Sequence, residues 1–122
     1  MIQSLLLPGL EVRPLERGGG VRTWHLVTVE RGAKEFLTGI TEFDPGAELA
    51  PHYHNCQESV VVLEGAAVFE AFGQRQTLEP HSATLIPTGT IHRFRNPGPG
   101  TLRILFIYGS TGATRTIVET PD

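Results

Sequence analysis

The sequence predicts an all-β fold, and three features of the chain lead to that prediction. Fourteen glycines and nine prolines are spread along the 122 residues, so little room is left for a long helix. The segments between these breaks are short and rich in β-branched and aromatic residues. Turn signals recur between them, which is the pattern of a β-sandwich or barrel.

The predicted strands follow from the positions of those turns. Asp44-Pro45-Gly46, Gly73-Gln74 and Asn96-Pro97-Gly98 are the clearest turn signals, and Gly65 and Pro87 end two further segments. The strands are therefore predicted, in order, at 21–30, 35–43, 58–63, 66–72, 75–78, 83–86, 91–95, 101–108 and 114–119.

Side-chain alternation leaves the inward face of two of these strands open. In 35–43, one face carries Phe36, Thr38 and Ile40, and the other carries Leu37, Gly39 and Thr41. The segment 101–108 is an almost continuous apolar run, so alternation assigns no inward face. Coverage on both faces fits such a run, as at the interface of a dimer.

Length and charge limit the possible partners. A chain of 122 residues is expected to form one domain, residues 1–122, with a core that buries roughly two thirds of the unfolded surface. The net charge of −3 and the absence of a lysine or arginine run give no footprint for nucleic acid or for an anionic membrane. A small-molecule ligand is the expected partner.

The N-terminal segment carries no targeting signal. Its apolar run Leu5–Leu7 stops at Pro8, too early for a signal peptide or a membrane span. The only cysteine is Cys56, so no intrachain disulfide can form. These absences favour the cytoplasm. Residues 1–20 are predicted to be an N-terminal arm that pairs with a second subunit in a homodimer.

Two histidines and a glutamate form the most informative cluster. His52 and His54 are two residues apart, so an extended backbone places both on one face, and Glu58 shares their parity. Val60 and Val62 continue that face toward the interior. Buried polar side chains are costly unless they are paired, and a divalent metal with imidazole and carboxylate ligands would remove that cost.

A further histidine belongs to the segment 91–95. His92, Phe94 and Asn96 share one face, and Arg93 and Arg95 share the other. Because charged arginines prefer water, the face of His92 is expected to point inward.

These residues match the two motifs of the cupin family. The first motif, G-x5-H-x-H-x3–4-E-x6-G, is met over residues 46–65 by Gly46, His52, His54, Glu58 and Gly65. The second, G-x5-P-x-G-x2-H-x3-N, is met over residues 81–96 by Pro87, Gly89, His92 and Asn96, but His81 replaces its first glycine. Ser82 stands where an aspartate commonly follows. The chain therefore resembles a small single-domain cupin.

The resemblance implies a double-stranded β-helix, or jelly-roll barrel, with a metal inside. By the motif, the metal ligands would be His52, His54, Glu58 and His92, and the ion would be one of Mn, Fe, Ni, Cu or Zn. Three neutral imidazoles and one carboxylate on a divalent ion leave a net charge of +1, and an octahedral ion would keep two open positions. Phe94, Val60 and Val62 are expected to line the substrate pocket.

The resemblance also implies a function. We expect a metal-dependent dioxygenase that acts on a small oxygenated organic molecule, with Glu58 as the catalytic base. The alternatives are a metal-dependent isomerase or decarboxylase, and a non-catalytic cupin that senses a small molecule or a metal.

Four other polar residues near the motifs have simpler interpretations. Cys56 falls between the parity of His54 and that of Glu58 and is interpreted as structural. His81 is expected at the surface, Asn96 is expected to stabilise the turn before Pro97, and His25 is mainly a strand residue with a pocket role as the alternative.

Overall fold

The computed structural model describes residues 1–119 and confirms the all-β class. The strands are β1 (Leu15–Gly18), β2 (Val21–Val27), β3 (Leu37–Phe43), β4 (His52–His54), β5 (Glu58–Glu64), β6 (Ala67–Ala71), β7 (Gln74–Leu78), β8 (Ala83–Ile86), β9 (His92–Arg95), β10 (Leu102–Tyr108) and β11 (Arg115–Ile117). Three single-turn 3-10 helices, η1 (Ile2–Leu5), η2 (Gly9–Glu11) and η3 (Val29–Arg31), complete the elements. No helix within residues 1–119 is long and apolar enough to cross a membrane.

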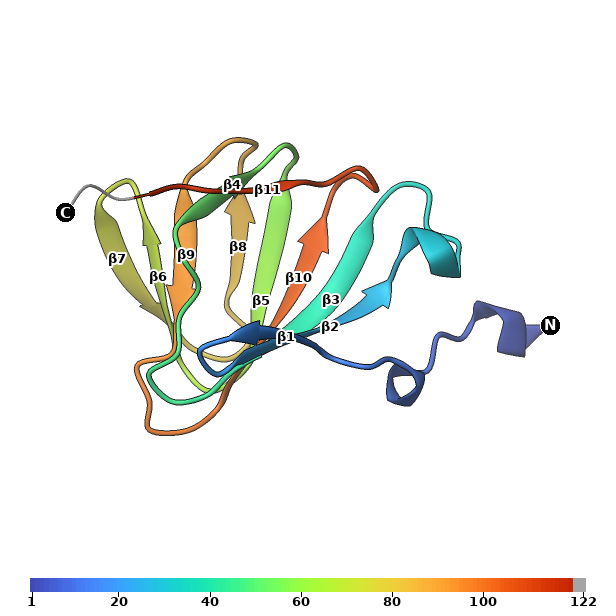
Figure 1. Cartoon of the computed structure of the whole chain (residues 1–122), viewed down its shortest axis with the longest axis horizontal. Coiled ribbons are helices and arrows are strands. Elements are labelled where there is room, and N and C mark those ends of the chain that lie inside the picture. The colour runs from blue at the N-terminus through green and yellow to red at the C-terminus, as the bar shows by residue number, and fades with distance from the viewer. Residues whose placement is uncertain (120–122) are drawn as a thin grey trace.

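The strands form two antiparallel sheets that face each other around the interior (Figure 1). One sheet has the order β1-β2-β3-β10-β5-β8, and the other has the order β11-β4-β9-β6-β7. From β3 onward the chain changes sheet at every connection except that between β6 and β7, including β4–β5 in the first motif and β8–β9 in the second. Both cupin motifs therefore contribute to both layers, which lets distant segments meet between them.

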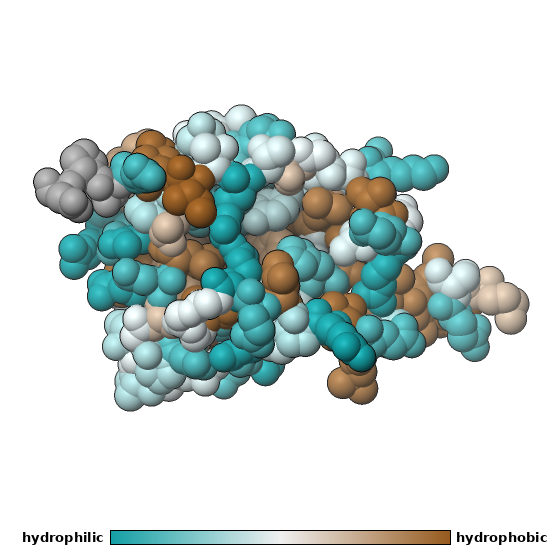
Figure 2. All heavy atoms as spheres, viewed as in Figure 1, coloured by the Kyte–Doolittle hydropathy of each residue, from teal (hydrophilic) through white to brown (hydrophobic). Residues whose placement is uncertain are grey.

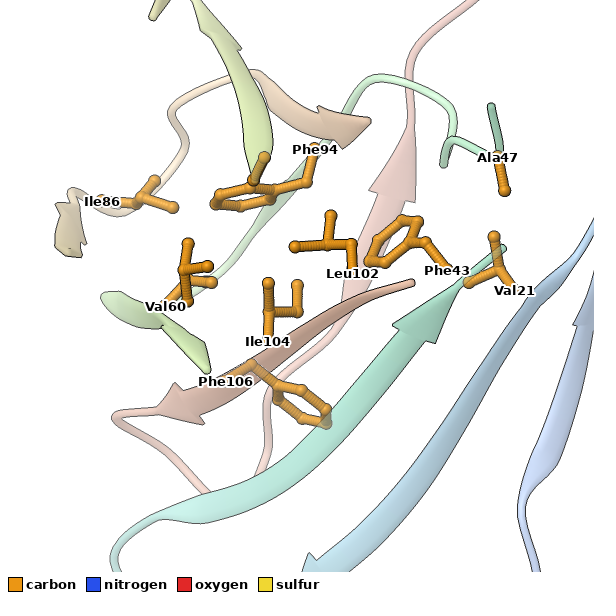
Figure 3. Packing of buried hydrophobic residues seen from close by; sticks show 11 residues of the cluster. Val21, Phe43, Ala47, Val60, Ile86, Phe94, Leu102, Ile104 and Phe106 are labelled. Atoms are coloured by element: carbon orange, nitrogen blue, oxygen red, sulfur yellow. The ribbon is translucent and has the colours of Figure 1, made fainter. Parts of the chain in front are cut away.

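The core lies between the two sheets (Figure 3). Phe94 of β9 projects from one sheet toward Val60 of β5 and Ile104 of β10 on the other. Phe43 and Leu102 pack beyond them and are fully buried. Burying such side chains stabilises the fold by about 1.5–3 kcal/mol each.

The structure resolves the two strands whose phase the sequence left open. On β3 the inward set is Gly39, Thr41 and Phe43, and on β10 it is Leu102, Ile104 and Phe106. A side chain at Gly39 would collide with the Phe106 ring and with the Trp24 carbonyl oxygen. Glycine at this position of β3 therefore leaves room for the inward Phe106 of β10. The outward Leu105 and Ile107 are half-buried.

Two short strands were absent from the predicted set. β1 lies inside the predicted N-terminal arm, so the arm that is free of the sheets covers only residues 1–14. β4 contains the two histidines of the first motif and has only three residues. The arm extends from the body at the right of Figures 1 and 2, and η1 and η2 bury none of their residues.

Two motif positions, 65 and 81, lie in turns where the backbone has a positive φ. Gly65 has φ of +80°, and a Cβ there would collide with the carbonyl oxygen of Thr101. His81, which replaces the family's glycine, also has a positive φ, +74°. The backbone thus keeps the conformation that glycine favours, although a histidine occupies the position.

Candidate metal centre

Three strands deliver the four motif residues to one place in the interior. β4 alternates buried, half-buried and buried, so His52 and His54 point inward and Tyr53 does not. His92 begins β9 and lies directly opposite His52 in the β4–β9 ladder. Glu58 begins β5 in the opposite sheet and is also buried. The predicted inward directions of all four side chains are confirmed.

The three imidazoles form a compact cluster. Their candidate ligand atoms all lie within 4.8 Å of one another. The Oε1 atom of Glu58 lies 3.0 Å from Nε2 of His92 and 3.3 Å from Nε2 of His54. Three buried histidines at this spacing could hold a metal ion, and the carboxylate lies within reach of the same centre.

Backbone carbonyls fix the orientation of every ring. The Nδ1 atoms of His52, His54 and His92 lie 2.8, 3.0 and 2.8 Å from the carbonyl oxygens of Ala50, Thr114 and Thr90. A carbonyl oxygen only accepts, so each Nδ1 carries the proton and donates it. In the neutral imidazole, the lone pair is then on Nε2, the nitrogen that faces the cluster.

The pKa values follow from burial and from the central carboxylate. Burial lowers the pKa of His52 to about 4, so this ring is neutral at pH 7. Burial is also the largest effect on the pKa of His54 and acts to lower it, but the nearby Glu58 carboxylate and the Thr114 carbonyl together outweigh burial, and the net pKa is raised. For Glu58, burial acts to raise the pKa, and the nearby imidazoles of His54 and His92 together turn the net shift downward.

One atom of the cluster lacks a partner. Nε2 of His54 is fully buried and makes no hydrogen bond among the described residues, although Glu58 Oε1 lies 3.3 Å from it. A buried nitrogen without a partner costs about 1–3 kcal/mol. A divalent ion would bind this lone pair together with those of His52 and His92, and Glu58 would offset its charge. The donor set therefore fits a transition metal.

The cluster opens onto a small interior cavity of about 40 Å³. Of the three residues expected to line a substrate pocket, Val60 and Phe94 line this cavity, whereas Val62 is fully buried in the apolar core and does not reach it. Several lining residues were not predicted from the sequence. They are Arg17, Thr41, Leu49, Ile104, Phe106, Tyr108 and Arg115.

His25 also lines this cavity, which favours the alternative that the sequence left open for it. It shares the parity of the buried Val21 and Thr23 on β2 but is itself exposed, with its ring 6.0 Å from that of Phe106. Tyr108 stands behind the cluster, with its ring centroid 4.7 Å from that of His54. Neither residue belongs to a motif, and only the strand phase could have indicated them.

The remaining polar residues behave as structural ones. Cys56 is buried, and burial raises the pKa of its thiol, so it supplies no thiolate at neutral pH. His81 is exposed. Asn96 is buried and fixes the following turn: its side-chain amide donates to the carbonyls of Phe43 and Gly100, and its Oδ1 accepts from Gly98 N.

Comparison with known proteins identifies relatives over most of the chain. The chain is 35% identical over 98 residues to the polyketide synthase CurC of Streptomyces cyaneus, an alignment that covers 79% of this chain and 63% of CurC. It is 32% identical over 102 residues to the dimethylsulfoniopropionate lyase DddW of Ruegeria pomeroyi, covering 83% of this chain and 65% of DddW. The chain thus spans slightly less than two thirds of the length of these relatives.

A solved structure and a family model match the same fold. The polyketide cyclase RemF from Streptomyces resistomycificus superposes with a TM-score of 0.82 at 22% identity, over 96% of this chain and 87% of RemF. The family model described as "Cupin domain" matches residues 39–108, more than half of the chain and both histidine segments. The chain therefore belongs to the cupin family.

Proposed function

We propose that this protein is a metal-dependent enzyme that activates a small oxygenated organic molecule for proton abstraction, in a cyclisation or an elimination. One observation carries the proposal: three buried imidazoles, each fixed through Nδ1 to a backbone carbonyl, direct Nε2 at a common centre beside a buried carboxylate. Such a centre is built to hold an ion before substrate arrives.

His52, His54, His92 and Glu58 would hold the metal, and the metal would supply Lewis acidity at a substrate carbonyl or carboxylate oxygen. The fixed Nδ1 hydrogen bonds keep the three rings from turning. The Glu58 carboxylate accepts a proton from the substrate carbon through the oxygen that does not hold the metal, since it is the carboxylate that lines the cavity. The apolar wall of Val60, Phe94 and Ile104 excludes water from that transfer.

The relatives support a reaction without an oxidant. CurC and RemF are named for polyketide synthesis and cyclisation, and DddW is named as a lyase. Cyclisation and elimination share one early event, removal of a proton next to an activating group. A dioxygenase is the second candidate, because the same imidazole and carboxylate ligands also suit redox-active ions such as iron and manganese.

The first test is elemental analysis of the purified protein. We expect about one transition ion per chain in the unaltered protein, a loss of that ion in His54→Ala, and full retention in the control His81→Asn, which alters an exposed histidine. Equal metal content in the two variants would contradict the ligand assignment.

The second test is turnover of 2-oxo acids, β-diketones and β-substituted carboxylic acids, with and without dioxygen. We expect substrate loss that continues under anaerobic conditions and disappears with Glu58→Gln. Turnover that requires and consumes dioxygen would favour the dioxygenase. Binding without any turnover would favour a sensor and contradict an enzyme.

The proposal includes a homodimer, because the N-terminal arm leaves Ile2, Leu5 and Leu10 exposed to water. A second subunit that covered them would remove this cost. Sedimentation velocity should give twice the chain mass for the unaltered protein and a dissociated species for the double variant Leu5→Glu with Leu10→Glu. A monomer at high protein concentration would contradict the dimer.

A further inference from the structure

Two arginines that lie outside both cupin motifs reach the interior cavity. Arg115 is on β11, directly opposite His54 in the β11–β4 ladder, and it lines the cavity together with His52, Glu58 and His92. Arg17 is on β1, at a register shift between Glu16 and Gly18 in the β1–β2 pairing. A bulge of this kind redirects a side chain, and Arg17 lines the same cavity.

A hydrogen-bonded chain holds Arg17 in that direction. Its Nη1 donates to Oγ1 of Thr23 at 3.1 Å, and the Thr23 hydroxyl lies 3.0 Å from that of Thr41. Both threonines are almost fully buried on the inner face of the barrel. Arg17 itself is half-buried, so its guanidinium lies between the interior and the solvent.

Five other arginines form ion pairs with carboxylates, and Arg17 and Arg115 do not in the described part of the chain. Arg22, Arg75, Arg93, Arg95 and Arg103 each lie within 4.0 Å of a carboxylate. Within residues 1–119, four arginines form no such pair, and of these only Arg17 and Arg115 line the cavity. The carboxylate that lines the same cavity, Glu58, is hydrogen-bonded to His92. Two cations thus face the cavity, and neither has a carboxylate within 4.0 Å among the described residues.

The charge of Arg17 acts on the cavity wall. After burial, it is the next cause that lowers the pKa of His25, so the ring of His25 is neutral at pH 7 and adds no cation. It also acts to lower the pKa of Tyr108, against burial and the charge of Glu58. The positive charge at this opening therefore comes from the two guanidinium groups.

We propose that the substrate is a small carboxylate, whose anionic group binds Arg17 and Arg115 at the mouth of the cavity while its reacting end lies against the histidine cluster. This proposal rests on the proposed function and names the substrate class of the same site. A guanidinium matches a carboxylate with two parallel hydrogen bonds, which favours arginine over lysine here. The volume of about 40 Å³ admits only a few atoms beyond the mouth.

The test compares malonate with malonamide, which has nearly the same shape and no charge, by titration calorimetry at pH 7.5. The metal-loaded protein should bind malonate at least tenfold more tightly. Arg17→Gln and Arg115→Gln should each weaken malonate binding by roughly tenfold or more, as expected for loss of a charge-assisted hydrogen bond. Arg17→Lys should retain part of the affinity.

Arg13→Gln is the matched control, because Arg13 is exposed and precedes β1. It should bind malonate as the unaltered protein does. Unfolding midpoints and metal content are measured for every variant, and Arg115 provides an independent variant on an exposed strand if Arg17→Gln does not fold. Malonate affinity that is equal in the control, in Arg115→Gln and in any folded Arg17 variant would overturn the proposal, as would malonamide binding as tight as that of malonate.

The same titration on metal-free protein separates this proposal from the proposed function. If the purified chain binds no metal, the proposed function fails, yet a preference for malonate that depends on Arg17 would still support the anion site. If metal binds and malonate affinity ignores both arginines, the carboxylate proposal fails and the metal centre stands.

Discussion

The two ends of the barrel interior are built from the same strands but differ in what burial costs them. On β5, Glu58 belongs to the histidine end and Val62 to the apolar end. Val60 and Phe94 lie between the two ends, since both line the cavity. The apolar end gains free energy from every contact it makes. The histidine end buries polar groups, including the unpartnered Nε2 of His54, and gains only if a ligand satisfies them. Strand alternation decides which side chains are buried. The apolar ones stabilise the fold, and the polar ones form the candidate site.

The largest expected effect is at the apolar end. Leu102→Ala should lower the free energy of unfolding by about 2–5 kcal/mol, because Leu102 is fully buried between the sheets and its loss leaves a cavity. Urea unfolding followed by tryptophan fluorescence measures the change. Leu105→Ala, on the half-buried outer face of the same strand, is the control and should cost clearly less. Equal losses would mean that the inner face is not the core.

A smaller loss of unfolding free energy is expected at Asn96, a buried polar residue whose hydrogen bonds hold a turn at the apolar end. Asn96→Ala removes three hydrogen bonds and leaves the carbonyls of Phe43 and Gly100 without their amide donor. We expect a loss of about 3 kcal/mol, since each unsatisfied buried group costs about 1–3 kcal/mol. Asn96→Asp should also destabilise, because it keeps the acceptor for Gly98 N and loses the donor. A neutral effect in urea unfolding would contradict the assigned role.

The pH dependence of metal-free protein tests the histidine end. The pKa of His52 is about 4 in the folded protein and near 6.5 when unfolded, so the unfolded state binds the proton more tightly. Stability from this group is therefore present above pH 6.5 and is lost as the pH falls toward 4, by at most about 3 kcal/mol. The raised pKa of His54 acts in the opposite sense, and the lowered pKa of Glu58 adds to the loss at still lower pH.

Chemical denaturation at a series of pH values measures this slope. His52→Gln should flatten it between pH 6.5 and 4, whereas His81→Asn, at the exposed histidine, should leave it unchanged. Bound metal should steepen the loss, because its ligands must be deprotonated. A slope that His52→Gln does not alter would mean that another group controls stability in this range.

The sequence predicted the histidine end better than the rest of the site. Motif spacing and alternation placed His52, Glu58 and His92 correctly, because both depend only on local strand geometry. Arg17 and Arg115 escaped prediction because β1 and β11 are short, mostly exposed strands without an apolar period. A bulge directs Arg17, and a pairing across 61 positions of the chain directs Arg115 toward His54. Neither is encoded in the spacing of neighbouring residues.

The smallest expected effect concerns His81, whose backbone supports the apolar end. Its N–H donates to the carbonyl of Val62 at 2.8 Å, while φ of +74° costs a histidine more than a glycine. His81→Gly should therefore raise the free energy of unfolding by up to about 1 kcal/mol, since relief of strain exceeds the entropy that glycine adds to the unfolded chain. His81→Ala keeps a Cβ at the same φ and should give no gain. A loss of stability in His81→Gly would show that the histidine side chain itself stabilises the turn, and metal content should be equal in both variants because the site lies at the other end.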